Sequence, residues 1–278
     1  MSDDPIKRIL VALDSSETNK STLQVATALA RKLNAQLQAL FVEDINLLHL
    51  AELPFAREVS ASTHIAKQLT LADMERQLSG QVRRLRQLVE QAGLQSQLPV
   101  EFKVLRGSVA SELCTAVEQM DLLVVGKNTQ LLRHSEKLGN ITRDMLTSSK
   151  CSLLLLQHGA SLERPVAVVY TGSNASRRAL QLGMQLAQGD HDQLSVLYPQ
   201  APEANQQLWQ DEVTTFAHAY DIDPKHIRLN ENNASALLNA LAACNGRILL
   251  LEADRGTFPA EQLQALLQQS TKPVILIR

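Results

Sequence analysis

The amino-acid sequence contains an internal repeat that covers most of its length. Segment 11–16 has a counterpart at 168–173, and the same offset of 157 residues relates 37–41 to 194–198. Toward the end of each copy the offset falls to 122. A repeated unit of this length predicts two domains that share one fold. It also allows the two copies to be compared position by position.

The chain length agrees with this division. A chain of 278 residues is long enough for two domains of roughly 100–200 residues, each with its own core. We predict one domain over residues 1–157 and a second over residues 165–278. The short segment 158–164 is the expected linker between them.

Composition and charge argue against several classes of partner. A net charge of −2 disfavours nucleic acid, because nucleic-acid-binding proteins usually concentrate basic residues on one face. No apolar run approaches the roughly 18 residues of a membrane span, and the acidic start of the chain does not resemble a signal peptide. The cysteines at 114, 151 and 244 form no metal-binding pair and suit a reducing compartment. We expect a cytoplasmic protein without membrane or nucleic-acid partners.

Strands alternate with helices in both copies. The apolar run Lys7–Leu13 ends in polar residues, which is typical of a strand buried on both faces of a parallel sheet. Helical spacing continues from there to Leu33, and the next strand is expected at 35–42. The alternation predicts an α/β fold with two repeated, doubly wound domains and helices on both faces of each sheet. The strands expected in the second copy are 165–170, 193–198, 226–230, 247–252 and 273–277.

The first copy contains a long helical excursion, residues 43–98, that the second copy lacks. From 71 to 89 apolar residues recur at spacings of three and four, which predicts an amphipathic helix of about seven turns that ends near Gly93. Its arginines are interspersed with acidic residues and glutamines, so we interpret them as a solvated face. Segment 45–66 is expected to loop or form a short helix. Together with helix 68–93 it is a candidate surface for protein contacts.

Glycines follow the predicted strands at the edge where such sheets bind ligands. Gly126 ends a buried strand, and Gly139-Asn140 opens a helix after a polar loop. Backbone N–H groups in this arrangement can hold a phosphate, helped by the helix dipole. Strand-end glycines are also common turn residues, so spacing alone leaves both interpretations open. The positive charges expected nearby are Lys127, Arg133, His134, Lys137 and Arg143.

Five segments resemble the landmarks of the universal stress protein family. They are Ile9–Ser16, Gly107–Ala110, Leu122–Gly126, Leu138–Thr142 and Lys150–Leu156. The likeness spans nearly the whole chain, which is thereby identified as a tandem member with two such domains. For each domain it implies a five-stranded parallel sheet of the adenine nucleotide alpha-hydrolase-like type. It also implies that the two domains pair through their last strands, and that ATP or AMP is bound by some members but not others.

The nucleotide-binding members carry a pattern of glycine, two residues, glycine, nine residues, then glycine and Ser or Thr. On this chain the pattern begins at Gly126 and meets Thr129, Gly139 and Asn140, so half of it is present. Thr129 has a Cβ that disfavours the positive φ that glycine permits. The change to Asn140 is milder, because asparagine can cap a helix.

The resemblance also assigns roles elsewhere in the first domain. Asp14 matches the acid that contacts the adenosine, and Val42 matches the backbone position beside the adenine. The full predicted cofactor-binding set is Asp14, Ser15, Val42, Gly107, Gly126, Thr129, Gly139, Asn140 and Ile141. The ligand expected there is ATP or AMP, with Mg²⁺ if it is ATP.

The second domain departs further from the nucleotide-binding pattern. Thr171 replaces the acid, Pro199 lacks a backbone donor, and Glu252 takes the position of the first loop glycine. A carboxylate disfavours a bound phosphate through charge repulsion. We therefore expect no cofactor in the second domain.

No catalytic arrangement accompanies the predicted site. Asp14 could serve as a base or metal ligand, but adenosine recognition or helix capping explains it more simply. The histidines show no repeated metal-binding spacing, and Ser15, Ser16 and Ser108 have no identifiable base partner. We expect a non-enzymatic regulatory stress protein that contacts an unknown regulatory protein, pairs its two domains within the chain and leaves a homodimer open. The alternatives are slow ATP hydrolysis or phosphotransfer, and a structural interaction module without nucleotide.

Overall fold

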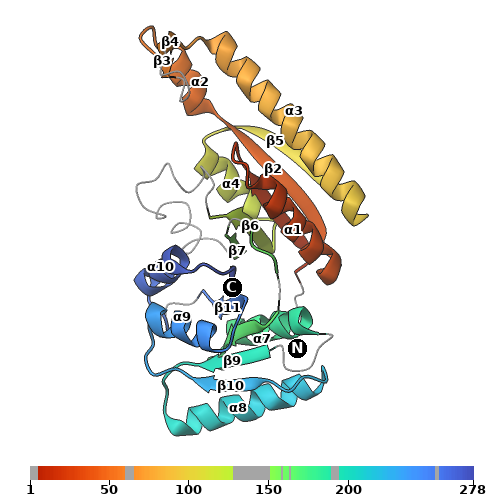
Figure 1. The fold of residues 1–278 in the computed structure, drawn as a ribbon, viewed down its shortest axis with the longest axis vertical. Coiled ribbons are helices and arrows are strands. Elements are labelled where there is room, and N and C mark those ends of the chain that lie inside the picture. The colour runs from red at the N-terminus through yellow and green to blue at the C-terminus, as the bar shows by residue number, and fades with distance from the viewer. Residues whose placement is uncertain are drawn as a thin grey trace.

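One ten-stranded sheet runs through the protein (Figure 1). The computed structural model describes residues 6–59, 66–127, 151–157, 159–162, 164–188, 194–253 and 257–278. The strand order is β10-β9-β8-β11-β12-β7-β6-β1-β2-β5. The first unit, residues 1–157, contributes β1 Arg8–Leu13, β2 Gln36–Asp44, β5 Val100–Gly107, β6 Leu122–Gly126 and β7 Ser152–Leu156. The second unit, residues 165–278, contributes β8 Val166–Val169, β9 Leu194–Tyr198, β10 Lys225–Arg228, β11 Ile248–Glu252 and β12 Val274–Ile277.

The two units meet through their last strands. Within the ten-stranded sheet, the strands of each unit pair in parallel, whereas β7 and β12, which join the units, pair antiparallel. Leu154 lies opposite Ile275 in this pair, and both side chains are fully buried. The pairing agrees with the one implied by the family resemblance. It makes the sheet continuous between the units.

Helices cover both faces of the sheet because strand residues alternate between two cores. Ile9 and Val11 of β1 belong to one core, and Leu10 and Ala12 belong to the other. The first core contains residues of α1 Asn19–Leu33, α3 Leu71–Ser96, α7 Asn174–Ala187 and α8 Glu203–His218. The second contains residues of α4 Val109–Val117, α9 Ala234–Ala243 and α10 Ala260–Gln269. Both cores extend across the two units, so the α/β fold predicted from the alternation is confirmed.

The excursion of the first unit forms an arm that we define as residues 45–59 and 66–78. It comprises α2 Ile45–Ala51, the antiparallel pair β3 Arg57–Val59 and β4 Ala66–Gln68, and the beginning of α3. In Figure 1 the arm extends beyond one end of the sheet. The small β3–β4 pair was not expected from the sequence. The arm has its own apolar cluster, made of Leu48, Ala51, Ala56, Leu69, Met74 and Leu78.

Helix α3 has the predicted length of about seven turns but lies three residues further along the chain than predicted. Gly93, the expected end, lies within the helix, and the chain leaves it at Gln97, whose φ is +52°. The amide of Leu98 donates to the carbonyl of Gly93 at 3.1 Å and closes the last turn. In the described ranges no helix is both long enough and apolar enough to cross a membrane.

Gly183 allows α7 to pack closely on β8. A Cβ at this position would lie 2.4 Å from Cγ2 of Val168, so Gly183→Ala is expected to lower the free energy of unfolding by about 1–2 kcal/mol through overpacking. Gly80 in α3 is the matched control, because its Cβ would meet nothing within 4 Å. Gly80→Ala should raise stability by up to about 1 kcal/mol. Urea unfolding followed by circular dichroism measures both, and a neutral Gly183→Ala would contradict the packing argument.

Candidate functional site

Four neighbouring strands bring part of the predicted site to one edge of the sheet. The order β6-β1-β2-β5 places the carboxyl ends of these strands side by side. Leu13 pairs with Phe41, so Asp14 lies level with Val42. The β1–β6 register, continued by two residues, places Gly126 one residue before that level, and Gly107 lies opposite Asp44. Asp14, Ser15, Val42, Gly107 and Gly126 therefore share the edge at which parallel α/β sheets bind ligands.

Asp14 is buried and organises the turn between β1 and α1. It is 5% exposed, and its Oδ1 accepts a hydrogen bond from the amide of Ser16 at 2.8 Å. Asn19 completes the turn, because its Nδ2 donates to the carbonyls of Asp14 at 2.6 Å and Ser16 at 2.8 Å. The adjacent Ser15 is exposed. Asn19 was not among the predicted site residues, because a polar residue five positions after a strand end is a weak signal in the sequence.

The β2–β5 side of the edge carries charged groups. Glu43 and Arg106 form an ion pair at 2.8 Å beside Val42. Asp44 caps α2 by accepting from the amide of Asn46 at 2.9 Å. At Gly107 an added Cβ would lie only 2.5 Å from a carboxylate oxygen of Glu112, so glycine allows that side chain to fold against the strand end.

The remaining predicted site residues fall outside the described ranges. Thr129, Gly139, Asn140 and Ile141 all lie within 128–150, so the sequence prediction for them stays a prediction. The same holds for Arg133, His134, Lys137 and Arg143.

Lys127 does not have the role that its sequence position suggested. Its Nζ donates to the carbonyls of Gln268 at 2.6 Å and Ser270 at 2.8 Å, at the end of α10 in the second unit. Gln157 donates to the carbonyl of Ser270 as well, at 3.0 Å. Burial lowers the pKa of Lys127, and the helix carbonyls compensate its charge. Lys127 therefore joins the two units. The last carbonyls of a helix have no hydrogen-bond partner within it, so they attract a cation.

Removing the Lys127 ammonium should weaken this contact. Lys127→Met keeps the aliphatic chain but removes the ammonium that donates to the Gln268 and Ser270 carbonyls, so stability should fall by about 1–2 kcal/mol. Lys20→Met is the matched control, since Lys20 is exposed in α1. Thermal unfolding measures both variants. An equal effect of the two substitutions would show that the hydrogen bonds to α10 contribute nothing.

In the second unit, side chains of the protein occupy the corresponding edge. Glu252 ends β11 and is only 2% exposed. The hydroxyl of Thr171 donates to one of its carboxylate oxygens at 2.8 Å, and the hydroxyl of Ser173 donates to the other. The turn itself is preserved, because Thr171 Oγ1 accepts from the amide of Ser173 as Asp14 accepts from Ser16, although at a longer 3.5 Å. Glu252 thus has its hydrogen-bond partners within the protein.

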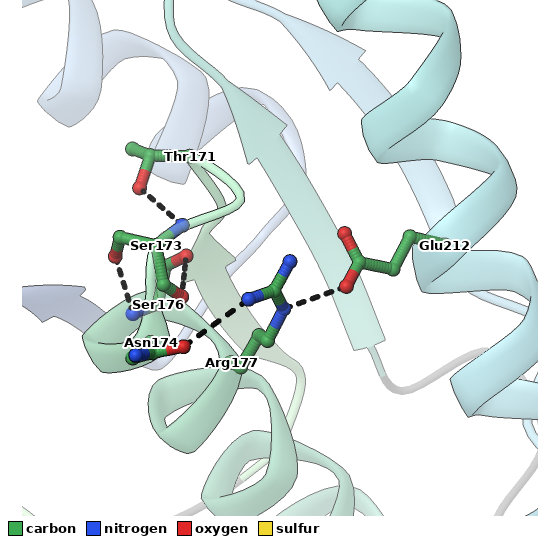
Figure 2. Close-up of polar contacts among 6 residues, drawn as sticks. All are labelled: Thr171, Ser173, Asn174, Ser176, Arg177 and Glu212. Atoms are coloured by element: carbon green, nitrogen blue, oxygen red, sulfur yellow. Dashed lines mark hydrogen bonds and ion pairs between the residues drawn. The ribbon is translucent and has the colours of Figure 1, made fainter.

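An ion pair between Arg177 of α7 and Glu212 of α8 lies beside this turn. Figure 2 shows Arg177 reaching toward Glu212 of α8. Its Nε donates to Oε1 of Glu212 at 2.6 Å. Burial tends to raise the pKa of Glu212, but the hydrogen bond and charge of Arg177 outweigh it and lower that pKa. Burial also raises the pKa of Tyr170, so its phenol stays neutral. The loop is closely covered, since a Cβ on Gly172 would lie 2.4 Å from the indole nitrogen of Trp209.

In the described part of the chain, no group of three or more His, Cys, Asp or Glu side chains could hold a metal ion. The first unit's edge carries the carboxylates of Asp14, Glu43 and Asp44. Asp14 and Asp44 each accept a hydrogen bond from a backbone amide, and Glu43 pairs with Arg106. The described geometry therefore places a buried acid and two strand-end glycines along one edge of the sheet.

Comparisons with known proteins agree with the fold. The universal stress protein family model matches residues 5–157. Among solved structures, a universal stress protein from Archaeoglobus fulgidus DSM 4304 superposes with a TM-score of 0.67 at 16% identity, covering 97% of this chain and 95% of that one. A functionally unknown protein from Pseudomonas aeruginosa PAO1 gives a TM-score of 0.56 at 12% identity, covering 98% and 92%. No protein of curated function matches the chain.

Proposed function

The chain belongs to the universal stress protein family, and we propose that it is a tandem, regulatory member that binds ATP or AMP in its first unit only. The observation that carries this proposal is the contrast between equivalent edges. Asp14 and Gly126 stand in the first unit where Thr171 and Glu252 stand in the second. An acid suits recognition of a ribose hydroxyl, and a glycine lets the backbone approach a phosphate.

The second unit supports the first rather than binding a ligand of its own. Its buried Glu252 is held by two hydroxyls, so a phosphate would have to displace a satisfied carboxylate or lie against its charge. The strand pair β7–β12 and the Lys127 contact join the two units. The signal is then passed on through protein contacts, without catalysis.

Nucleotide titration tests the proposal. Isothermal titration with ATP, ADP and AMP, each with and without Mg²⁺, should show one site per chain. Asp14→Thr copies the second unit and can keep the turn hydrogen bond while removing the carboxylate, so affinity should fall at least about tenfold. Gly126→Glu should abolish binding by adding bulk and charge.

The second unit provides the control. Thr171→Ala alters the position equivalent to Asp14 and should leave the affinity unchanged. Absence of binding at millimolar nucleotide would overturn the proposal, as would binding that Thr171→Ala abolishes and Gly126→Glu does not. Measured turnover of ATP would replace it with an enzymatic role.

A further inference from the structure

Exposed apolar side chains gather on the arm. Seven large apolar residues are exposed in the described ranges, and five of them belong to the arm: Leu47, Leu50, Leu53, Phe55 and Leu71. Phe55 is the most exposed of the five, at 75%. Single exposed apolar residues are ordinary on a protein surface, but a contiguous group marks an interaction site. The other two, Leu94 and Leu208, lie at the end of α3 and on α8.

Helix α2 is apolar on two sides. Leu48 and Ala51 face the arm's own cluster, while Leu47 and Leu50, three residues apart, are exposed. A helix with apolar residues around its circumference is usually covered on both sides. The seven residues of α2 are also too few for a helix to be stable in isolation. The arm therefore presents a surface that a second apolar surface would stabilise.

The charges beside this surface favour binding to the same surface of a second copy of the chain. Glu52 and Arg57 are exposed and opposite in sign, and within the described part of the chain neither side chain forms an ion pair. In a twofold contact, each residue meets a different residue of the other copy, so Glu52 of one chain can face Arg57 of the other. A membrane surface would instead favour a predominantly basic border. Asp44 and Glu52 flank α2 with negative charge.

The second unit of the same chain has no arm that could cover this surface. In the second unit β9 ends at Tyr198 and α8 begins at Glu203, so the arm has no counterpart there. The last strands, which could otherwise pair two chains, are already paired within one chain. We propose that the arm is a self-association surface through which two copies of the chain form a twofold dimer, independently of any nucleotide.

The contact is small, so the dimer is weak and reversible. The five side chains expose on the order of 400 Å² per copy, about half of what each partner contributes to a standard interface. A dissociation constant of about 1–100 μM is expected, in the range of transient contacts. Sedimentation equilibrium of the full chain, without nucleotide, from about 1 to 300 μM should show the average mass rising from one chain toward two.

Matched substitutions locate the contact. Phe55→Asp and Leu50→Asp should keep the chain monomeric over this concentration range, whereas Leu94→Asp and Leu208→Asp should leave the dimer unchanged. All four positions are exposed, so the circular dichroism spectrum and unfolding temperature should not change. A chain that stays monomeric at all concentrations would overturn the proposal. So would a dimer that persists in both arm variants.

A charge exchange distinguishes a self-contact from any other partner. Glu52→Arg and Arg57→Glu should each weaken the dimer at least about tenfold, because like charges then meet across the twofold axis. The double variant restores the opposite pairs in both copies and should recover most of the affinity. Additive loss in the double variant would refute the twofold contact. Binding of the monomer to phosphatidylglycerol vesicles, lost in Phe55→Asp, would assign the arm to a membrane instead.

Discussion

Leu154→Asp is expected to disrupt the middle of the sheet and leave little folded protein. Leu154 is fully buried on the central strand β7, opposite Ile275 of the other unit. An aspartate there would be buried without a partner, and the expected loss of stability exceeds about 4 kcal/mol. Because both apolar cores extend across the units, the damage should not remain in one of them. The measurement is the soluble yield together with the urea midpoint of whatever folds.

Milder variants keep this prediction measurable if the aspartate variant does not fold. Leu154→Ala and Ile275→Ala should each cost about 2–5 kcal/mol, and because the two residues touch, the double variant should differ from the sum of the singles. Leu94→Asp, at an exposed position, is the control and should change stability by less than about 0.5 kcal/mol. A Leu154→Asp protein as stable as this control would contradict the β7–β12 pairing.

Glu252→Ala should destabilise the second unit by about 2–4 kcal/mol. The substitution removes the acceptor of both the Thr171 and Ser173 hydroxyls and leaves a cavity at a position that is 2% exposed. Ser173 also accepts from the amide of Ser176 at 2.9 Å and caps α7, so its loss of order should spread into that helix. Thermal unfolding gives the total effect. Hydrogen exchange of the α7 amides shows where it is felt.

Two further variants separate the contribution of the Glu252 charge from that of its side-chain volume. Glu252→Gln preserves the volume and still accepts one hydroxyl, so a loss of only about 1 kcal/mol is expected. Glu203→Gln is the exposed control, because Glu203 pairs with Arg228 at the surface and such pairs contribute little. If Glu252→Ala were as stable as the wild type, the hydroxyl network would have no structural role. The proposal that the second unit holds no nucleotide would then lose its main support.

Much of the fold could be predicted from the sequence because it follows from local patterns. Buried parallel strands appear as short apolar runs, as at 248–252, and helices as spacings of three and four, as at 174–187. The β3–β4 pair escaped because two three-residue strands carry too little pattern. The end of α3 was misplaced because glycine is the usual signal for a helix end, whereas here Gln97 adopts the left-handed conformation.

The candidate site was predictable in part. The residues at strand ends, such as Asp14 and Gly126, follow from the order of elements, since parallel strands bring their carboxyl ends to one edge. The partners of Lys127 did not follow, because they lie in the other unit, more than 140 residues along the chain. Asn19 was missed because its hydrogen bonds go to the backbone, which any polar residue near a turn can do.

The sequence by itself determined the repeat, the alternation of strands and helices, and the loss of the acid and the glycine from the second copy, since each of these is a local property of residue type. Only the tertiary structure decided that Glu252 is buried and satisfied by Thr171 and Ser173, that Lys127 joins the two units, and that the arm leaves Phe55 exposed. Burial and hydrogen-bond partners depend on contacts between distant segments. Those contacts form only when the sheet places the segments side by side.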